Sequence, residues 1–335
     1  MGRLIAVRPV WAIQGGRVSL EGDSLPVDPD VALVRVGGVP ARLAKASTTA
    51  LTVIIPEGLE GGQTAIRIDQ LPGETAFIDV GTPLATGLHQ VDSPAYDRHG
   101  NLFVTFSGSR GQQAPVTMFV VRHDGTREPF VSDVPNPTSL AFSPDGELFV
   151  SSRFDGSVYR ITADGRATLH ASELGIACGI AFSPDGALYV GDRSGSILRV
   201  DDQGRTETFA TLPASVAAFH LAFGPDAALY VTGPTLGPSD VVYRIPPNGR
   251  PAVCAIGFGR PQGLAFDAAG YLYVVDALAG SSGVYRFRAT APDERELVLS
   301  GGALIGLAFD PHGGIAIATT DSVYRLAVGI HGLLP

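Results

Sequence analysis

The stretch GIAFSPDGALYV, residues 179–190, places a Ser-Pro-Asp-Gly turn between two short apolar runs. Similar stretches recur along the chain, each with an aromatic residue before the turn, at positions 96, 142, 182, 223, 266 and 309. Successive aromatic positions are 46, 40, 41, 43 and 43 residues apart. A repeat of roughly 40–45 residues is typical of proteins built from stacked supersecondary units. These six copies therefore decide the architecture.

Each copy holds further apolar runs, which are short, rich in Val, Ile, Tyr and Phe, and bounded by Gly, Pro, Asp or Asn. That composition predicts strands. Four strands per repeat and six repeats predict an all-β fold, a six-bladed β-propeller of four-stranded blades, over residues 81–335. The last copy has only three runs, so we expect a strand near residues 82–86 to supply the fourth and close the ring.

Residues 1–80 do not share this repeat. Their apolar runs, such as 51–56 and 65–68, are shorter and are separated by different turns. About seven short strands in such a segment predict a small immunoglobulin-like β-sandwich. The chain is therefore expected to contain two domains, a sandwich over 1–80 and a propeller over 81–335.

Two parts of the chain resemble known families. The pattern of Gly15-Gly16, Gly37-Gly38, Leu51-Thr52-Val53 and Gly61-Gly62 resembles the IPT/TIG immunoglobulin-like domain, which implies a spacer or an interaction module. Residues 88–328 resemble NHL-type propellers and the related gluconolactonase and senescence-marker superfamily. This second resemblance implies the propeller fold, whereas the function stays open because one fold hosts unrelated chemistries.

The composition excludes several classes of partner. The 335 residues are 45% hydrophobic and 17% charged, and they carry a formal net charge of −9. An acidic chain repels phosphate backbones, so we expect no nucleic-acid partner. No apolar run approaches the roughly 18 residues of a membrane-spanning helix, so we expect no membrane partner. Cys178 and Cys254 have neither the spacing of a metal motif nor the density of a disulfide framework.

The first residues, MGRLIAVRP, are interrupted by arginine and proline and lack the pattern of a secretory signal. The sequence as written therefore predicts a cytoplasmic protein. If a signal peptide has been removed from it, the predicted location becomes periplasmic or secreted.

The predicted blades bring two kinds of segment to one face of the ring. Because the chain reverses at every turn, the start of the first strand and the end of the second share a face. Loops on this face, such as 107–113, 233–238 and 277–282, are irregular, and function concentrates in such loops. One residue per blade opens the innermost strand and is expected to ring the channel mouth: Asp92, Thr138, Cys178, Phe219, Gln262 and Ile305.

The resemblance to gluconolactonases implies a divalent metal held at this ring by Glu, Asn and Asp side chains. Asp92 falls where that family carries its Glu and is the one candidate metal ligand at a family position, with Asn136 as a displaced substitute. A hard cation needs several oxygen ligands, and Phe219 and Ile305 supply none. We therefore expect no cofactor, with calcium or zinc as the alternative.

Other residues offer chemistry at the same face. Cys178 is a candidate nucleophile, although no histidine is predicted beside it. His220 or His89 is a candidate base if the propeller acts as streptogramin lyases do. Arg153 and Arg193 end the second strands of adjacent blades, with Asp192 and Asp276 nearby, and these residues form either a clamp for a carboxylate or sugar acid or ordinary surface ion pairs.

Two hypotheses remain from the sequence. The first is a non-catalytic protein that binds a protein or a small carbohydrate-like ligand at the channel mouth, with no catalytic residue. The second is an enzyme, a metal-dependent hydrolase similar to gluconolactonase or a lyase similar to streptogramin lyase, with an altered active site. The lack of a ring of oxygen ligands favours the first.

Overall fold

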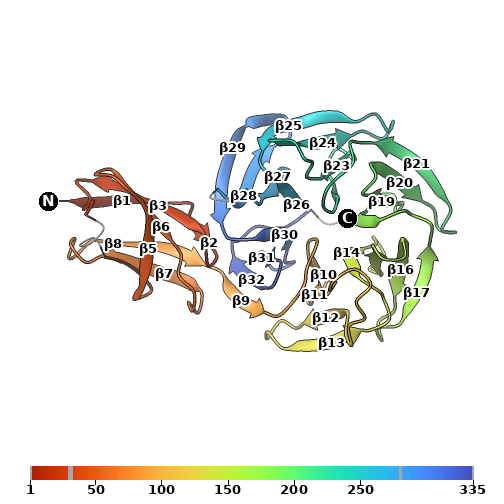
Figure 1. Ribbon diagram of the computed structural model, residues 1–335, viewed down its shortest axis with the longest axis horizontal. Coiled ribbons are helices and arrows are strands. Elements are labelled where there is room, and N and C mark those ends of the chain that lie inside the picture. The colour runs from red at the N-terminus through yellow and green to blue at the C-terminus, as the bar shows by residue number, and fades with distance from the viewer. Residues whose placement is uncertain (1, 29–32, 279–280, 334–335) are drawn as a thin grey trace.

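The computed structural model describes residues 2–28, 33–278 and 281–333, so part of the predicted loop 277–282 lies outside the described residues. Within these ranges the regular secondary structure consists of β-strands alone. The strands form a propeller of four-stranded blades, and further strands extend from one side of it (Figure 1). The all-β propeller predicted from the repeats is confirmed.

The repeats form antiparallel sheets in which neighbouring strands follow in chain order. The first two sheets contain β10 (Ala95–Tyr96), β11 (Leu102–Thr105), β12 (Met118–Val121), β13 (Arg127–Val131), β14 (Pro137–Phe142), β15 (Leu148–Ser152), β16 (Ser157–Ile161) and β17 (Ala167–Ala171). The next two contain β18 (Ala177–Phe182), β19 (Leu188–Asp192), β20 (Ser196–Val200), β21 (Thr206–Thr211), β22 (His220–Phe223), β23 (Leu229–Thr232), β24 (Asp240–Ile245) and β25 (Ala252–Phe258). The last repeats contain β26 (Pro261–Phe266), β27 (Tyr271–Asp276), β28 (Gly283–Arg288), β29 (Ala291–Ser300), β30 (Leu304–Phe309), β31 (Gly314–Thr319) and β32 (Val323–Ala327).

The innermost strands are arranged as a ring. Along the chain each one packs against the next, in the order β10, β14, β18, β22, β26 and β30, and β30 packs against β10. The fourth strand of the last sheet is β9 (Thr82–Ala85), which precedes the propeller and pairs antiparallel with β32. The closing strand predicted near residues 82–86 is therefore present, and it joins the two ends of the ring (Figure 1).

The aromatic residues that define the repeat pack between blades. Phe182 lies edge-to-face on Phe149 of the preceding blade, with ring centroids 4.9 Å apart. Four further anchors make the same contact at centroid distances of 4.8–5.5 Å, in the pairs Phe142–Phe103, Phe223–Tyr189, Phe266–Tyr230 and Phe309–Tyr273. Each such pair contributes about 0.5–1.5 kcal/mol beyond its buried area. The repeat in the sequence is thus a repeat of contacts between blades.

The residues before the propeller form β1 (Arg3–Arg8), β2 (Trp11–Ala12), β3 (Arg17–Asp23), β4 (Val34–Val36), β5 (Val39–Ala46), β6 (Ala50–Ile54), β7 (Gly62–Ile68) and β8 (Thr75–Val80). Their buried residues, such as Leu20, Leu51 and Ile66, share one hydrophobic cluster. The short strand β2 pairs in parallel with both β8 and β29. One hydrogen-bonded sheet therefore runs from β1 into the blade of β26–β29. This continuity does not support the separate immunoglobulin-like sandwich predicted from the sequence.

Ile13 fixes the junction between these strands and the propeller. Its backbone N–H donates to the carbonyl oxygen of Ser300 at 2.9 Å. Its side chain is fully buried in a cluster of propeller residues that includes Leu304 and Leu326. Burying an aliphatic side chain of this size contributes about 1.5–3 kcal/mol. The N-terminal strands are therefore held to the ring by an apolar contact as well as by backbone hydrogen bonds.

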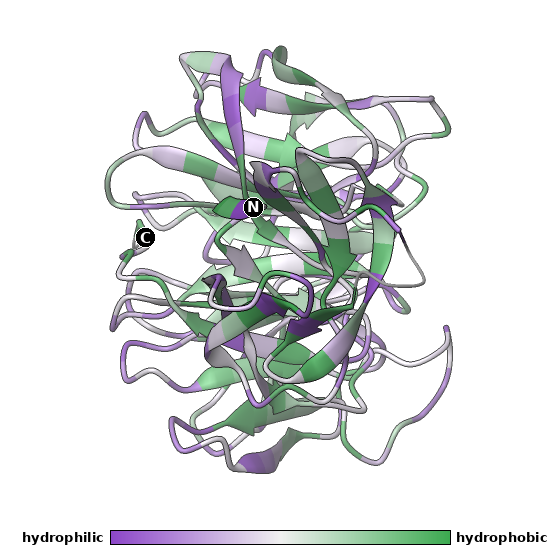
Figure 2. Ribbon diagram, turned by 90° about the vertical axis from the view of Figure 1, so that its left-hand side faces the viewer, coloured by the Kyte–Doolittle hydropathy of each residue, from purple (hydrophilic) through white to green (hydrophobic). Residues whose placement is uncertain are grey.

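Strands and loops differ in the hydropathy of their residues. Figure 2 shows hydrophobic residues mainly along the strands and many hydrophilic residues in the connecting loops. No helix in the described part of the chain has the length and apolar character needed to span a membrane.

Candidate functional site

A cavity of about 440 Å³ opens on one face of the propeller. Some of its lining residues belong to the innermost strands, as Thr138 and Cys178 do. Others directly follow the second strands, as Arg153 and Arg193 do. These are the two kinds of segment that the strand order places on one face. The volume lies within the range of roughly 300–1,000 Å³ found for small-molecule sites.

The structure brings most of the predicted mouth residues together. The predicted residues that line the cavity are Thr138, Arg153, Cys178, Arg193, Gln262 and Ile305. The remaining candidates, which are Asp92, Asp192, Phe219, His220 and Asp276, do not line it. None of the described residues that line the cavity is an aspartate or a glutamate. The cavity wall is therefore basic and apolar rather than acidic.

Arg153 and Arg193 occupy equivalent positions in adjacent blades. The Nη2 group of Arg153 donates to the carbonyl oxygen of Gly108 at 2.8 Å, and that of Arg193 donates to Val216 at 2.9 Å. The Nε atoms of both arginines are buried and have no hydrogen-bond partner. Leaving a buried donor unpaired costs about 1–3 kcal/mol. An anion that accepted hydrogen bonds from both Nε groups would remove this cost.

The electrostatic surroundings of Arg153 also favour an anion. Burial lowers the pKa of Arg153, and the positive charges of Arg193 and Arg110 lower it further. Positive charges that lie this close repel, and a bound negative charge offsets that repulsion. Neither Arg153 nor Arg193 forms an ion pair within the described ranges, so the surface ion pairs considered from the sequence are not what holds them.

Asn136 holds the loop that carries Gly108. Its side-chain oxygen accepts the N–H of Gly111 at 2.7 Å, and its amide nitrogen donates to the carbonyl oxygens of Ser107 and of Ser109, the latter at 2.8 Å. The residue is fully buried and has a φ of 42°, a conformation in which asparagine is enriched. Asn136 is therefore a brace for the loop beside Arg153, not a substitute metal ligand.

Asp92 and His220 pair beneath the cavity wall. The Nδ1 atom of His220 lies 2.5 Å from the Oδ1 atom of Asp92, and its Nε2 atom lies 3.1 Å from the Oε1 atom of Gln262. His220 is 1% exposed and Asp92 is 6% exposed. Both ring nitrogens are therefore engaged with buried neighbours. His220 is not available as a base for a molecule in the cavity, which corrects its placement at the channel mouth.

The predicted metal position does not fit a divalent cation. The carboxylate of Asp92 also accepts the backbone N–H of Ser93 at 2.6 Å, and the side-chain oxygen of Gln262 faces His220. Calcium needs about six to eight oxygen ligands, and zinc needs about four ligands of nitrogen, sulfur or oxygen. In the parts of the chain that the structure describes, no group of three or more His, Cys, Asp or Glu could hold a metal ion.

Cys178 lines the cavity as a protonated thiol. Burial raises the pKa of this thiol to about 12, despite the opposing effect of Arg193. The thiolate is the nucleophilic form of cysteine, and it is scarce at neutral pH when the pKa is so high. The geometry therefore gives Cys178 a packing role at the wall of the cavity.

Phe219 lies in the hydrophobic core, 1% exposed, and not at the channel mouth as predicted. A Cβ atom at Gly233 would lie 2.4 Å from its ring, so the ring fills the space that this glycine leaves. The cause is a difference in register. Strands β14, β18 and β26 each have an irregularity near their start, whereas β22 pairs with β23 without one. His220, the first residue of β22, pairs with Thr232, and its side chain meets Asp92 and Gln262, whereas Phe219 precedes the strand.

Asp192 and Asp276 are buried supports of the backbone rather than partners of the arginines. Asp192 accepts the N–H of Ile176 at 2.8 Å. Asp276 accepts the N–H groups of Gly259 and Arg260 at 2.9 and 2.6 Å. Each carboxylate ties the segment before the first strand of its blade to the end of the second strand. The clamp predicted from these four residues is thus reduced to its two arginines.

His89, the second candidate base, lines the cavity, and its Nδ1 atom is buried without a partner. Two further parts of the wall were not predicted from the sequence. Arg260 lines the cavity and adds a third guanidinium group. The apolar segment 216–218, which leads into β22, lines it as well. Both precede an innermost strand, so extending the predicted ring by a few residues on the N-terminal side would have found them.

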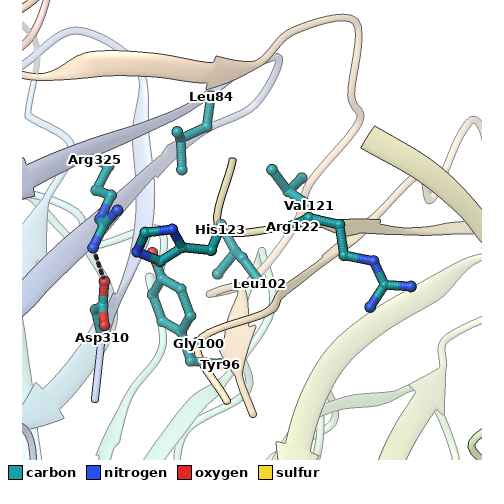
Figure 3. A pocket seen from close by; sticks show the side chains of 9 residues that line it. All are labelled: Leu84, Tyr96, Gly100, Leu102, Val121, Arg122, His123, Asp310 and Arg325. Carbon is teal, nitrogen blue, oxygen red and sulfur yellow. Dashed lines mark hydrogen bonds and ion pairs between the residues drawn. The ribbon is translucent and has the colours of Figure 1, made fainter. Parts of the chain in front are cut away.

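A second, much smaller void lies between the first and last blades (Figure 3). It is lined by Tyr96 and His123, among others, and by the ion pair of Arg325 with Asp310, whose atoms are 2.5 Å apart. Its volume of about 10 Å³ corresponds to roughly one water molecule. This void is therefore too small for a ligand.

Two short segments match protein-family models. Residues 179–200 match the N-terminal strictosidine synthase-like model, and residues 131–159 match the model of the WD domain, G-beta repeat. Each match covers only a small part of the chain, so it reflects the repeat. No curated protein matches the chain.

Solved structures with this fold come from differently named proteins. An auxiliary nutrient binding protein from Bacteroides ovatus is 15% identical, with a TM-score of 0.56 over 99% of this chain and 98% of its own. A gluconolactonase from Xanthomonas campestris is 17% identical, with a TM-score of 0.60 over 73% and 88%. The calcium-binding protein regucalcin from Agrobacterium tumefaciens is 18% identical, with a TM-score of 0.58 over 76% and 95%. At these identities the likeness shows the propeller fold alone.

Proposed function

We propose that this protein binds a small organic anion in the cavity at the channel mouth and does not catalyse a reaction on it. The observation that carries the proposal is the pair of buried, unpaired Nε donors on Arg153 and Arg193. Hydrogen bonds from arginine to an anion are charge-assisted and about twice as strong as neutral ones. Arg260 adds a further positive charge to the wall.

Two kinds of observation support binding over catalysis. The residues at the position where gluconolactonases carry their metal do not fit a cation. Cys178 is protonated at neutral pH. Among proteins of the same fold, the Bacteroides ovatus protein is described as an auxiliary nutrient binding protein and matches nearly the whole chain. A small-ligand binder is the reading consistent with both.

The proposal includes a domain organisation. Residues 81–335 form a six-bladed propeller, supported by the ring of six innermost strands. Residues 1–80 form a domain of the IPT/TIG type that serves as a spacer and that β2 joins to the blade of β26–β29. A hydrophobic cluster drawn from this segment alone supports this assignment. In this arrangement the ligand cavity belongs to the propeller.

The experiment is a calorimetric titration of the purified protein with organic carboxylates, including hexanoate and gluconate. We expect saturable binding of at least one carboxylate by the wild-type protein. The double variant R153Q/R193Q should lose at least tenfold in affinity, since one charge-assisted hydrogen bond contributes about 1.5–3 kcal/mol. The control is R166Q/R205Q, because Arg166 and Arg205 have side chains that are 75% and 79% exposed and do not line the cavity. This variant should bind as the wild type does.

Two outcomes would overturn the proposal. The first is that no carboxylate binds, or that the two double variants bind equally well. The second is stoichiometric calcium or zinc in protein purified without chelator, together with lactone hydrolysis that Asp92→Ala abolishes. That result would establish a metal-dependent hydrolase instead.

A further inference from the structure

The cavity wall combines guanidinium groups with aliphatic segments. Arg153 and Arg193 follow the second strands of two adjacent blades, those of β14 and β18. The aliphatic segments 216–218, before β22, and 303–305, at the start of β30, line other parts of the wall, on either side of Arg260, which precedes β26. In the ring of innermost strands β30 is three positions from β18 in either direction. Ile305 therefore lies on the side of the ring opposite Arg193.

Three uncharged polar groups of the wall are already hydrogen-bonded within the protein. Gln90 donates its amide to the carbonyl oxygens of Thr319 and Ser322 at 3.0 and 3.2 Å. The hydroxyl of Thr138 donates to the backbone of Asn136 at 3.2 Å. The side-chain oxygen of Gln262 faces the His220 ring. These three groups are therefore less available to the hydroxyl groups of a ligand, and buried hydroxyls without partners are costly.

Large apolar side chains are exposed in loops on the face where the cavity opens. Phe154 directly follows Arg153 and is 50% exposed, and Leu278 directly follows Ala277 and is 45% exposed. Leu236, in the loop after β23, is 92% exposed. All three lie in loops that follow second strands, on the face where the cavity opens. Exposed apolar residues gathered around a pocket mark a surface that meets an apolar partner.

We infer that the ligand is an organic monocarboxylate with an apolar body, rather than a sugar acid. Its carboxylate lies between Arg153 and Arg193, and its hydrocarbon body lies along residues 216–218 and Ile305. This inference rests on the proposed function, since it assigns the chemical class of the anion that the same cavity binds. Burial of the hydrocarbon supplies the hydrophobic part of the affinity, and the guanidinium groups fix the orientation.

The test compares three probes of six carbons by calorimetry. Hexanoate carries the carboxylate and an apolar chain, gluconate carries the same carboxylate on a chain of hydroxylated carbons, and hexan-1-ol carries the chain without the charge. We expect hexanoate to bind at least tenfold more tightly than gluconate, and hexan-1-ol to show no saturable binding. The variant Ile305→Ser should weaken hexanoate binding severalfold and leave gluconate binding unchanged. The control is Leu169→Ser, because Leu169 is 60% exposed on β17 and does not line the cavity.

The outcomes separate this inference from the proposed function. Gluconate binding as tightly as hexanoate, or more tightly, would overturn the inference while leaving anion binding in place. Saturable binding of hexan-1-ol with the affinity of hexanoate would overturn both, because the arginines would then contribute nothing. The comparison of probes uses the wild-type protein, so it stands even if Ile305→Ser fails to fold.

Discussion

The side chains of Asp92 and His220 meet at 2.5 Å although the two residues are 128 positions apart in the chain. Asp92 precedes β10, and His220 begins β22. These innermost strands are three positions apart in the ring whichever way it is followed. The contact therefore joins opposite sides of the propeller through its centre. It gives the ring a polar cross-link that the contacts between adjacent blades do not provide.

Removing the carboxylate from this cross-link should destabilise the fold. Asp92→Ala leaves His220 without its acceptor in a buried site, and leaving a buried hydrogen-bonding group unpaired costs about 1–3 kcal/mol. Asp92→Asn keeps a side-chain oxygen at the same position and should cost clearly less. Urea unfolding at neutral pH measures both free energies. Equal stability of the two variants would show that the hydrogen bond to His220 contributes little.

The junction before the propeller makes a second prediction. Ile13→Ala removes a fully buried side chain from the cluster that contains Leu304 and should lower the free energy of unfolding by about 2–5 kcal/mol. Ile5→Ala is the matched control, since Ile5 lies on β1 and is 61% exposed. It should change stability by less than about 0.5 kcal/mol. Thermal unfolding of the two variants distinguishes them, and a similar loss in both would contradict the role assigned to Ile13.

The propeller could be predicted from the sequence because each repeat encodes local contacts. Phe182 and Phe223 mark the repeat, and each packs on an aromatic residue of the blade before it. The closing strand β9 followed from counting strands, since the last repeat lacked one. Both patterns depend on the spacing of residues within about one repeat, so they can be recognised in the sequence itself.

The details of the site could not be predicted in the same way. Aligning the repeats places Phe219 beside Cys178, but β22 lacks the irregularity that β18 has near its start. A change of one residue in register reverses which side chains face the channel. The pairing of His220 with Asp92 depends on this reversal and on two distant segments meeting. Neither the strand register of β22 nor the contact between His220 and Asp92 can be predicted from the sequence of a single repeat.

Alkaline pH should destabilise the protein through groups whose pKa is raised by folding. Burial raises the pKa of Cys178 from 9.0 to about 12 and that of Tyr273 from 10.0 to about 12. Between these values the unfolded chain has released protons that the folded chain retains. The free energy of unfolding is therefore steady below about pH 9 and falls as the pH rises towards 12.

Urea unfolding at a series of pH values measures this dependence. Cys178→Ala removes the more deeply buried of the two thiols and should flatten the decline just above pH 9. Cys254→Ala should flatten it less, because burial raises the pKa of this less buried thiol as well. Alkylation of Cys178 in the native protein should also be slow at pH 8. Because burial raises the pKa of this thiol to about 12, the reactive thiolate is scarce in the folded protein at pH 8. Rapid alkylation of Cys178 in the native protein at that pH would contradict the raised pKa.

The loop beside Arg153 provides the last prediction, because a single side chain holds it. Asn136→Ala removes the hydrogen bonds to Ser107, Ser109 and Gly111. It also places alanine at a φ of 42°, which costs about 1–2 kcal/mol. The freed loop should be cut by trypsin after the exposed Arg110 at least tenfold faster than in the wild type. Affinity for carboxylates should fall as well, since Gly108 positions Arg153.

Asn136→Gly separates the two causes. Glycine adopts a positive φ at no steric cost, so this variant lacks the amide but avoids the backbone strain. If the hydrogen bonds of the amide hold the loop, Asn136→Gly is cut nearly as fast as Asn136→Ala. If backbone conformation alone holds it, Asn136→Gly resists trypsin as the wild type does. The three contacts made by one fully buried side chain favour the first result, and the second would refute the brace assigned to Asn136.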